Sequence, residues 1–296
     1  MNLHGLRIFY TVLQKGSITK AASALHISQP AVSSQLKSFE LEIGMPLFEK
    51  KGRTLAPTQL GKDLAHKADT LFAVERNIET FLDDCIHARA GSIRIAATYL
   101  PAYFLLPRWA GSFKSSHPYI NVSIHTSNSK EAFTQLTQYK ADIAMYAGIP
   151  KDRPDEIIWD ELFTDELWFV VAPSHPLAGK KMSLTELTSE PFVMREEGST
   201  TRARLYALCQ ANQIAPPTIA LEFTGLNEAI SAVSAGFGVN FVSSLVASDY
   251  IKRGLLARVD VEDITAVNKI AICTRKNEQP SKLVQKFVAH CKEMPL

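Results

Sequence analysis

The 296-residue sequence has no long hydrophobic run and no recognisable leader. No apolar stretch reaches the roughly 18 residues needed to span a bilayer. The opening residues, MNLHGLRIFYTVLQKGS, lack the basic start and the long apolar core of a signal peptide. These absences predict a soluble protein that has no membrane partner and stays in the cytoplasm.

Cysteine is scarce, and no two cysteines form a C-x-x-C pair. This spacing argues against a disulfide framework and against a zinc site. Two interpretations remain: buried free thiols in a reducing compartment, or a redox pair of distant cysteines that meet in the fold. The cysteines are Cys85, Cys209, Cys273 and Cys291.

No enzyme constellation stands out either. The sequence has no G-x-S-x-G motif, no P-loop and no paired cysteine-histidine spacing. His117 and His175 each precede a proline in an S-H-P turn, and His125 stands alone. The sequence therefore predicts no catalytic residue, no metal site and no cofactor.

The sequence does contain an uneven distribution of charge. The whole chain carries a formal net charge of only +2. Within residues 1–57, seven basic and three acidic residues leave +4, so the remainder carries −2. A basic head on a slightly acidic body indicates a polyanion as the partner of the head.

Three short helices are expected in this head. Residues 3–14 carry an apolar face, and Gly16 ends that helix. A second helix ends at Leu25 before a short turn. Ser28 can cap a third helix that has Pro30 in its first turn, where a missing N–H costs little.

The third helix is expected to have one buried and one exposed face. Small polar and basic side chains lie off its apolar stripe, and their size lets the helix enter a major groove about 12 Å wide. A basic β-ribbon with the tip Lys51-Gly52-Arg53 follows, which completes a winged helix-turn-helix. A small helical bundle whose serines only face water is the alternative. The stripe is Val32, Leu36, Phe39 and Ile43, and the outward set is Ser33, Ser34, Gln35, Lys37 and Ser38.

Residues that face a groove or a phosphate backbone are the DNA-binding candidates. Gln29, near the start of the third helix, can reach base edges. Arg53, at the ribbon tip, can reach the backbone or the minor groove. The full predicted set is Thr19, Gln29, Pro30, Ser33, Ser34, Lys37, Lys50, Lys51 and Arg53.

A long helix without proline follows the ribbon. Thr58 can cap it, and it is expected to run to about Ala90. One apolar stripe repeats every seven residues, which predicts a coiled coil between two chains. The stripe is Leu64, Leu71, Ile78 and Cys85.

From Gly91 onward, short β-type runs alternate with helical stretches. This alternation predicts an α/β region with largely parallel sheets. Its roughly 200 residues suit either one domain or two lobes. The runs are SIRIAAT, NVSIHT, DIAMY, ELWFVVA, IALEF, GVNFVS and NKIAICT.

Residues 21–61, AASALHISQPAVSSQLKSFELEIGMPLFEKKGRTLAPTQLG, closely resemble the N-terminal signature of LysR-type transcriptional regulators. Phe39 departs from the usual leucine, and Leu60 from the alanine that often precedes the glycine. Lys50 replaces the usual arginine, which puts a bidentate phosphate contact there in doubt. The matching positions are Ala21-Ala22, Leu25, Ser28-Gln29-Pro30-Ala31-Val32-Ser33, Gln35-Leu36, Glu40, Gly44, Leu47-Phe48, Thr58 and Gly61.

The resemblance implies a multidomain α+β regulator of transcription that binds bent, roughly palindromic double-stranded DNA. It implies a homo-oligomer, a dimer through the linker helix and then a tetramer, with RNA polymerase as a further partner. The implied parts are a winged helix-turn-helix at 1–58, a linker helix at 59–90, and an effector-binding domain at 91–296. That domain has the periplasmic-binding-protein fold of type 2, with lobe I at about 91–163 and 268–296 and lobe II at about 164–267.

Polar residues follow several of the expected strands. In the family the effector lies in the cleft between the lobes, and an open α/β sheet places ligands at its strand ends. Residues 98–100, 127–129 and 146–148 each follow an expected strand, and residues 195–202, REEGSTTR, open a helix. These four segments are therefore expected to line the effector cleft.

The loop REEGSTTR has the features of an anion site. Gly198 gives a flexible turn, hydroxyl and N–H groups follow at a helix start, and Arg195 and Arg202 add positive charge. Glu196 and Glu197 count against a purely anionic preference, and an ordinary capped helix with solvated charges is the alternative. Similar loops in the family bind carboxylate, sulfate or phosphate groups, so the predicted effector is a small organic or inorganic anion.

Thr224 and the segment 235–241 are expected to line the other lobe. The complete predicted effector-binding set is Thr98, Tyr99, Leu100, Ser127, Asn128, Ser129, Tyr146, Gly148, Arg195, Gly198, Ser199, Thr200, Thr201, Arg202, Thr224 and Phe241.

Two other classes of protein would use an α/β cleft of this kind. A ligand-sequestering protein would carry a signal peptide and no helix-turn-helix, and the sequence has the reverse. A small-molecule enzyme would need a nucleophile and a base, and no such pair is visible.

Overall fold

The computed structural model describes residues 2–51, 54–86, 91–276 and 278–294. The chain divides into two compact units, Met1–Thr80 and Phe81–Leu296. Two sequence predictions, the reach of Arg53 and the end of the long helix near Ala90, lie outside the described residues.

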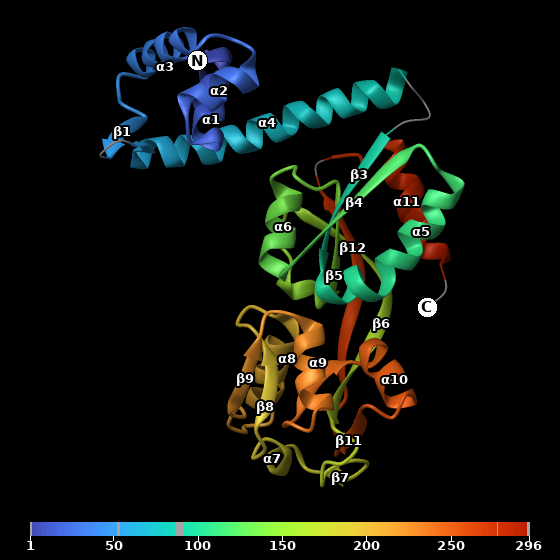
Figure 1. Ribbon diagram of the computed structural model, residues 1–296. Helices are drawn as coiled ribbons and strands as arrows, with labels where there is room; N and C mark the ends of the chain where they lie inside the picture. Colours follow the sequence, from blue (N-terminus) through green and yellow to red (C-terminus); the bar gives the residue numbers. More distant parts are fainter. Residues whose placement is uncertain (1, 52–53, 87–90, 277, 295–296) are drawn as a thin grey trace. The chain divides into compact units, whose positions relative to one another are not determined.

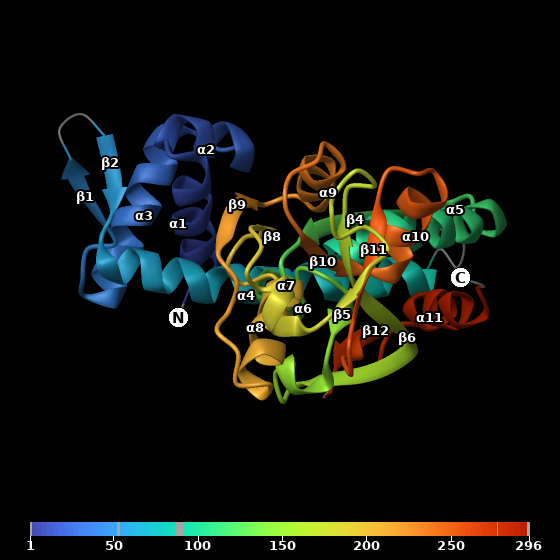
Figure 2. The ribbon, with the colours of Figure 1, turned by 90° about the horizontal axis from the view of Figure 1, so that it is seen from below.

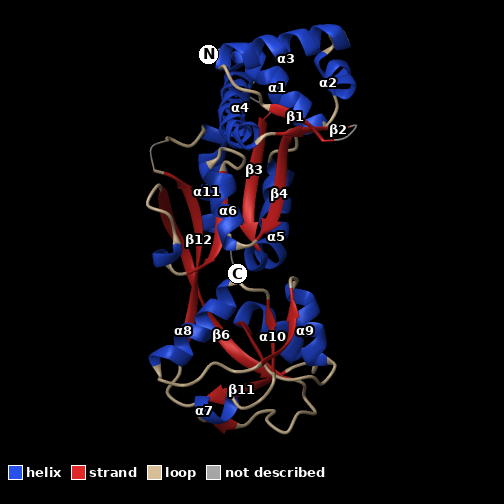
Figure 3. Ribbon diagram, turned by 90° about the vertical axis from the view of Figure 1, so that its left-hand side faces the viewer, coloured by secondary structure: helices blue, strands red, loops and turns tan. Residues whose placement is uncertain are grey.

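The N-terminal unit begins with the three predicted helices, α1 (Leu3–Lys15), α2 (Ile18–Leu25) and α3 (Gln29–Ile43), which Figure 3 shows packed together. Gly16 ends α1 with a left-handed φ of 62°, a conformation that glycine adopts at little cost. The Ser28 hydroxyl accepts a hydrogen bond from the Ala31 N–H at 3.3 Å, so it caps α3 as predicted.

The predicted buried stripe of α3 is confirmed except at its end. Val32, Leu36 and Phe39 are buried in one cluster with residues of α1 and α2. A side chain at Gly5 would meet the Phe39 ring at 2.6 Å, so α1 approaches α3 closely at this glycine. The prediction was wrong for Ile43, which is 36% exposed because it lies in the last turn, beyond the core.

The predicted ribbon is the antiparallel hairpin of β1 (Phe48–Lys51) and β2 (Thr54–Pro57), drawn as a pair of arrows in Figure 2. The Glu40 carboxylate on α3 accepts hydrogen bonds from the N–H groups of Leu47 at 2.7 Å and Phe48 at 3.1 Å. This pair of charge-assisted bonds attaches the start of the hairpin to the helix.

The long helix is α4 (Gln59–Ile86). Thr58 caps it as predicted, because its hydroxyl accepts a hydrogen bond from the Gly61 N–H at 3.0 Å. Ala68 and Phe72 are buried in the core of the N-terminal unit. Two members of the predicted heptad stripe, Leu71 and Ile78, are exposed.

The second unit is built on one twisted sheet. Among the described residues, eight strands belong to it: seven in the order β4-β3-β5-β12-β6-β11-β7, and β10 paired to β6. The strands are β3 (Gly91–Thr98), β4 (Ile120–Ser127), β5 (Ile143–Gly148), β6 (Ile157–Val171), β7 (Lys181–Met182), β10 (Asn240–Ser243), β11 (Ala257–Val261) and β12 (Ala266–Arg275), with β8 (Phe192–Arg195) and β9 (Ile219–Phe223) pairing separately.

Helices and helical turns lie between these strands. The turn at Pro101–Leu105 is π-helical, and the one at Pro150–Asp152 is 3-10. The helices are α5 (Leu106–Ser116), α6 (Ser129–Thr137), α7 (Leu184–Leu187), α8 (Thr200–Ala211), α9 (Leu226–Ser234), α10 (Ser244–Lys252) and α11 (Lys282–Glu293).

The prediction of largely parallel sheets was wrong for most of the main sheet. Strand β3 is parallel to β4 and β5, but β12 is antiparallel to both β5 and β6, and β10 and β11 are antiparallel to β6. The cause is that β6 and β12 run through the unit in opposite directions. The alternation of apolar and polar side chains does not indicate the direction in which a strand runs relative to its neighbour.

The unit has two lobes that share these two long strands, as Figure 1 shows. Lobe I consists of β3–β5 with α5, α6 and α11, and lobe II consists of β7–β11 with α7–α10. The predicted run ELWFVVA is only the second half of β6. Its first half reads IIWDELFTD, in which acidic and polar residues interrupt the apolar run that would predict a strand.

No helix in the described ranges is both long and apolar enough to cross a bilayer.

Candidate DNA-binding surface and ligand cleft

The predicted recognition residues of α3 share one exposed face. Gln29, Ser33 and Lys37 follow one another at i, i+4 and i+8 and are all exposed, as are Pro30 and Ser34. The i+4 spacing aligns the first three along the helix axis. Short polar side chains in such a row can contact base edges in a major groove, and a lysine at its end can contact the phosphates beside the groove.

Helix α2 contributes one residue to this surface. The Thr19 hydroxyl donates a hydrogen bond to the Gln29 side-chain oxygen at 3.3 Å, which orients the Gln29 amide at the start of α3. Gln35 was expected to face outward but is half-buried. Its side-chain oxygen pairs with His4 Nε2 at 2.7 Å, so it joins α3 to α1 and leaves the exposed row.

The structure describes two of the three basic residues that were predicted for the hairpin. Lys50 and Lys51 belong to strand β1. Arg53 lies outside the described residues. Their contacts to DNA remain predictions.

In the C-terminal unit, six of the predicted effector residues line one small cavity between the lobes. Thr98, Tyr99 and Leu100 come from the end of β3 and the residues after it, and Arg195, Thr200 and Thr201 come from β8 and α8. The cavity measures about 40 Å³. At roughly 10–15 Å³ per water, it holds about three water molecules.

Two contacts across the lobes explain why this cleft is narrow. The Ser129 hydroxyl on α6 and the Thr200 hydroxyl on α8 form a hydrogen bond of 2.9 Å. The Arg195 guanidinium lies over the Tyr99 ring, 3.9 Å from the ring centre. The structure therefore shows the lobes in a closed arrangement.

Both arginines of the predicted anion site are already paired with carboxylates. Arg195 forms an ion pair of 2.5 Å with Glu196 and donates to the Thr224 carbonyl oxygen at 3.3 Å. Arg202 forms an ion pair with Glu222, and its hydrogen bonds to Tyr206 and Glu222 raise the pKa of its guanidinium.

Since neither arginine is a free cation, the positive character of the cleft depends on the N-terminus of α8. Ser199 caps this helix by accepting a hydrogen bond from the Arg202 N–H at 3.3 Å. Thr200 and Thr201, in the first turn of α8, line the cleft. Their hydroxyl groups and the first-turn N–H groups are suited to bind a carboxylate or a phosphate.

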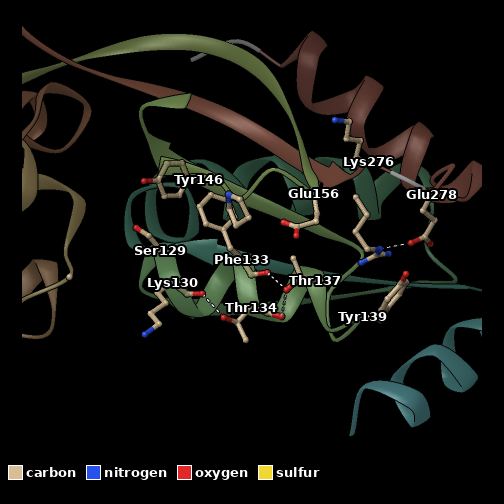
Figure 4. Close-up of a pocket in the computed structure, with 13 residues that line it drawn as sticks. Ser129, Lys130, Phe133, Thr134, Thr137, Tyr139, Tyr146, Glu156, Lys276 and Glu278 are labelled. Carbon is tan, nitrogen blue, oxygen red and sulfur yellow. Dashed lines mark hydrogen bonds and ion pairs between the residues drawn. The ribbon is translucent and has the colours of Figure 1, made fainter. Parts of the chain in front are cut away.

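Three other predicted effector residues line a different and larger cavity. Ser129, Tyr146 and Gly198 border a hollow of about 750 Å³ beside α6. Figure 4 shows its lining side chains. Lys130 and Lys276 bring positive charge to it, and Glu156 and Glu278 bring negative charge. The sequence placed residues of the two cavities in a single cleft.

The remaining predicted residues line neither of these two cavities. The prediction that Phe241 lines the cleft was wrong. Its side chain is 1% exposed and packs on Phe169 in the core of lobe II, with ring centres 4.5 Å apart. Gly148 is needed for packing, because a side chain there would overlap the Tyr146 ring. Asn128 caps α6 by accepting a hydrogen bond from the Glu131 N–H at 2.9 Å. The others are Ser127, Ser199, Arg202 and Thr224.

Sequence reasoning missed several residues of the small cavity. The missed residues are Leu226, Val242, Ser243, Val246 and Asn268, and Ala147 of the predicted segment 146–148 completes the lining. Most are apolar residues that any α/β core would contain. Asn268 is a polar residue in the middle of β12, and only the pairing of β12 with β6 brings it to the cleft.

Two protein-family models cover the chain. Residues 3–62 match the helix-turn-helix of the LysR family of bacterial regulatory proteins. Residues 87–295 match the LysR substrate binding domain. The second match alone covers more than half of the chain.

Known relatives are similar over nearly their full lengths. The chain is 34% identical to a RuBisCO operon transcriptional regulator of Allochromatium vinosum, over 88% of this chain and 86% of that protein. Full-length CbnR in complex with its target DNA has a similar fold, with a TM-score of 0.73 at 22% identity over 99% of both chains. The regulatory domain of CcmR from Synechocystis in complex with 2-PG gives a TM-score of 0.62 at 23% identity, over 68% of this chain and 95% of that one.

Proposed function

Because the chain belongs to the LysR family of transcriptional regulators, we propose that it binds a double-stranded operator through α3. We further propose that a small effector between the lobes of the C-terminal unit modulates this binding. The exposed row Gln29, Ser33 and Lys37 is the observation that supports the DNA-binding residues. Gln29 reads base edges, and Ser33 and Lys37 contact phosphates.

The proposed assembly is a dimer through α4, and then a tetramer. The exposed apolar residues Leu71 and Ile78 support this pairing, because a second copy of α4 would cover them. Two copies of α3 then reach two half-sites of a roughly palindromic operator. The proposed division is DNA-binding domain 1–58, linker helix 59–90 and effector domain 91–296.

The proposed effector is a small molecule with an anionic group. Its carboxylate or phosphate binds at Thr200 and Thr201, at the start of α8, with Thr98 and Tyr99 on the opposite wall. The effector acts by favouring one arrangement of the lobes over another through differential affinity. On this proposal the protein works in the cytoplasm, catalyses no reaction and contacts RNA polymerase at the promoter.

The DNA-binding part is tested by salt-dependent binding to the DNA upstream of the gene. Lys37→Ala should flatten the slope of log K against log salt by about one unit. Lys286→Ala, which removes an exposed lysine from α11, is the matched control and should leave the slope unchanged. If no DNA of that region is bound, a sequestering protein or an enzyme becomes the better description.

The effector part is tested by thermal shift of the full chain with small carboxylates, sulfate and phosphate esters. A compound that binds the folded protein raises its Tm by mass action. Thr201→Val should reduce the shift given by any active compound, because the variant loses one hydroxyl at the start of α8 and keeps the bond between Ser129 and Thr200. An unchanged shift would place the compound elsewhere.

A further inference from the structure

Two buried polar side chains face each other where β6 and β12 pass between the lobes. Asp165 on β6 is the register partner of Asn268 on β12. Asp165 is 3% exposed and Asn268 is 1% exposed. In an antiparallel pair, opposite side chains share one face of the sheet, with Cβ atoms about 4.5–5.5 Å apart. Asn268 also lines the small interlobe cavity.

Each of these side chains holds one buried oxygen that has no hydrogen-bond partner. Asp165 Oδ1 accepts from the Ser244 hydroxyl at 2.8 Å and from the Leu245 N–H at 3.4 Å. The Ser243 hydroxyl is a further hydrogen-bonding neighbour of this carboxylate. Asp165 Oδ2 and Asn268 Oδ1 are both buried and unpaired. Buried polar atoms are nearly always paired, so two such acceptors on facing residues require an explanation.

Rotation of the Asn268 amide about its Cβ–Cγ bond supplies the pairing. With the NH₂ group turned toward Asp165, the amide donates to Asp165 Oδ2 and that oxygen is satisfied. The amide oxygen of Asn268 then faces the cavity. A carbonyl oxygen in that position can only accept, so it selects a ligand that donates a hydrogen bond.

We propose that Asn268 determines the specificity of the cleft, and that Asp165 is its positioning residue. This inference rests on the proposed effector site. The effector has a carboxylate at Thr200 and Thr201 and a hydroxyl or ammonium group on the adjacent carbon, which donates to the Asn268 oxygen. Because the cavity measures only about 40 Å³ in the closed arrangement, compact hydroxy acids and amino acids of two or three carbons are the first probes for it.

The test is thermal unfolding of the full chain with two matched series at equal ionic strength. The first series is acetate, glycolate and glycine, and the second is propionate, lactate and alanine. Members of a series differ only in the donor on the carbon next to the carboxylate. At least one donor-bearing member should bind about tenfold more tightly than acetate or propionate, because one hydrogen bond to a buried partner is gained.

Variants separate the role of each residue. Asn268→Leu should remove the preference for the donor and leave acetate binding unchanged. Asn268→Ala is a smaller truncation that should also remove the preference, so it serves if the leucine variant does not fold. Asp165→Asn should also remove the preference, because its new amide donates to the Asn268 oxygen and turns the Asn268 NH₂ toward the cavity. Asn121→Leu, on the exposed strand β4, is the control and should keep the preference.

Equal shifts within a series, or no shift with any of the six compounds, would overturn the inference. A preference that survives Asn268→Leu would overturn it as well. Failure of the proposed function has a different result: Thr201→Val would then leave the shifts of all active compounds unchanged, whatever their donors.

Discussion

The Arg195 guanidinium of lobe II lies 3.9 Å from the centre of the Tyr99 ring of lobe I. Its charge is balanced by Glu196 within its own lobe. Arg195 therefore contributes to the closed cleft as a planar group packed on a ring, together with the hydrogen bond between Ser129 and Thr200.

Tyr99→Leu should loosen this closed arrangement. Loss of a largely desolvated cation–π contact costs about 1–2 kcal/mol, and the population of open lobes rises accordingly. Amide hydrogen exchange in residues 195–202 should become faster. Tyr250→Leu removes a ring contacted by Arg253 within lobe II and is the control. Unchanged exchange in Tyr99→Leu would mean that the ring does not hold the lobes together.

Gly61→Ala should destabilise the N-terminal unit by about 2–3 kcal/mol. A Cβ at this position would lie 2.2 Å from the Leu47 carbonyl oxygen, so the start of α4 or the hairpin must shift. Gly111→Ala in α5 meets nothing within 4 Å and should stabilise the C-terminal unit by about 0.5–1 kcal/mol.

The two units can be followed separately in these glycine variants. All three tryptophans belong to the C-terminal unit, so their fluorescence reports on that unit, whereas circular dichroism reports on both. Gly61→Ala should lower the denaturant midpoint seen by circular dichroism alone. A parallel loss in tryptophan fluorescence would contradict the local origin of the effect.

Glu40→Ala should detach the hairpin from α3. The variant leaves the N–H groups of Leu47 and Phe48 without their carboxylate partner, at a cost of about 2–4 kcal/mol. The amides of Leu47 and Phe48 should exchange faster, and DNA affinity should fall. Glu49→Ala, one strand position after Phe48 and exposed, should leave the exchange of both amides unchanged.

The described thiols should be unreactive in the folded protein. Burial raises the pKa of Cys273 and Cys291 to about 12 and also raises the pKa of Cys209. Thiolate is the reactive form, so these residues stay protonated at neutral pH. In a Cys85→Ser variant, a disulfide reagent at pH 8 should label the three remaining thiols only after denaturation. Rapid labelling in buffer would revive the hypothesis of a redox pair.

Asp165 should make stability depend on pH in a defined direction. Burial, as the largest cause, raises its pKa above the ordinary value of about 3.9. Between the two values the folded state binds more protons than the unfolded chain, so this residue adds stability as pH falls. Asp165→Asn should therefore raise Tm most at pH 7–8, and the gain should shrink toward pH 4. If the variant raised Tm by the same amount at every pH, the cause would be packing and not the ionisation of Asp165.

The head of the chain could be predicted from the sequence because its signals are local. Ser28 and Thr58 cap helices within three residues of themselves, and Gly16 ends a helix by its own backbone conformation. The exposed row on α3 follows from the helical period alone. Gln35 was misplaced because its partner His4 belongs to another helix.

The ligand cleft was only partly predictable because it is made by long-range pairing. The segments after β3 and before α8 were found from their polar composition. Asn268 and Asp165 lie far apart in sequence, and only the register of β6 and β12 makes them neighbours. Phe241 and Asn240 are adjacent in β10, a short strand that is buried on both faces, so the sequence does not show which of its side chains reaches the cleft.

The path of β12 has a consequence for synthesis on the ribosome. This strand lies between β5 and β6 in the sheet, yet it is the last strand of the chain. The sheet therefore lacks the strand between β5 and β6 until residues 266–275 have left the exit tunnel. The strands that belong to lobe II alone emerge before that point. Nascent chains arrested before residue 266 should contain an unfolded lobe I, and chaperone binding should end only after the chain has been released from the ribosome.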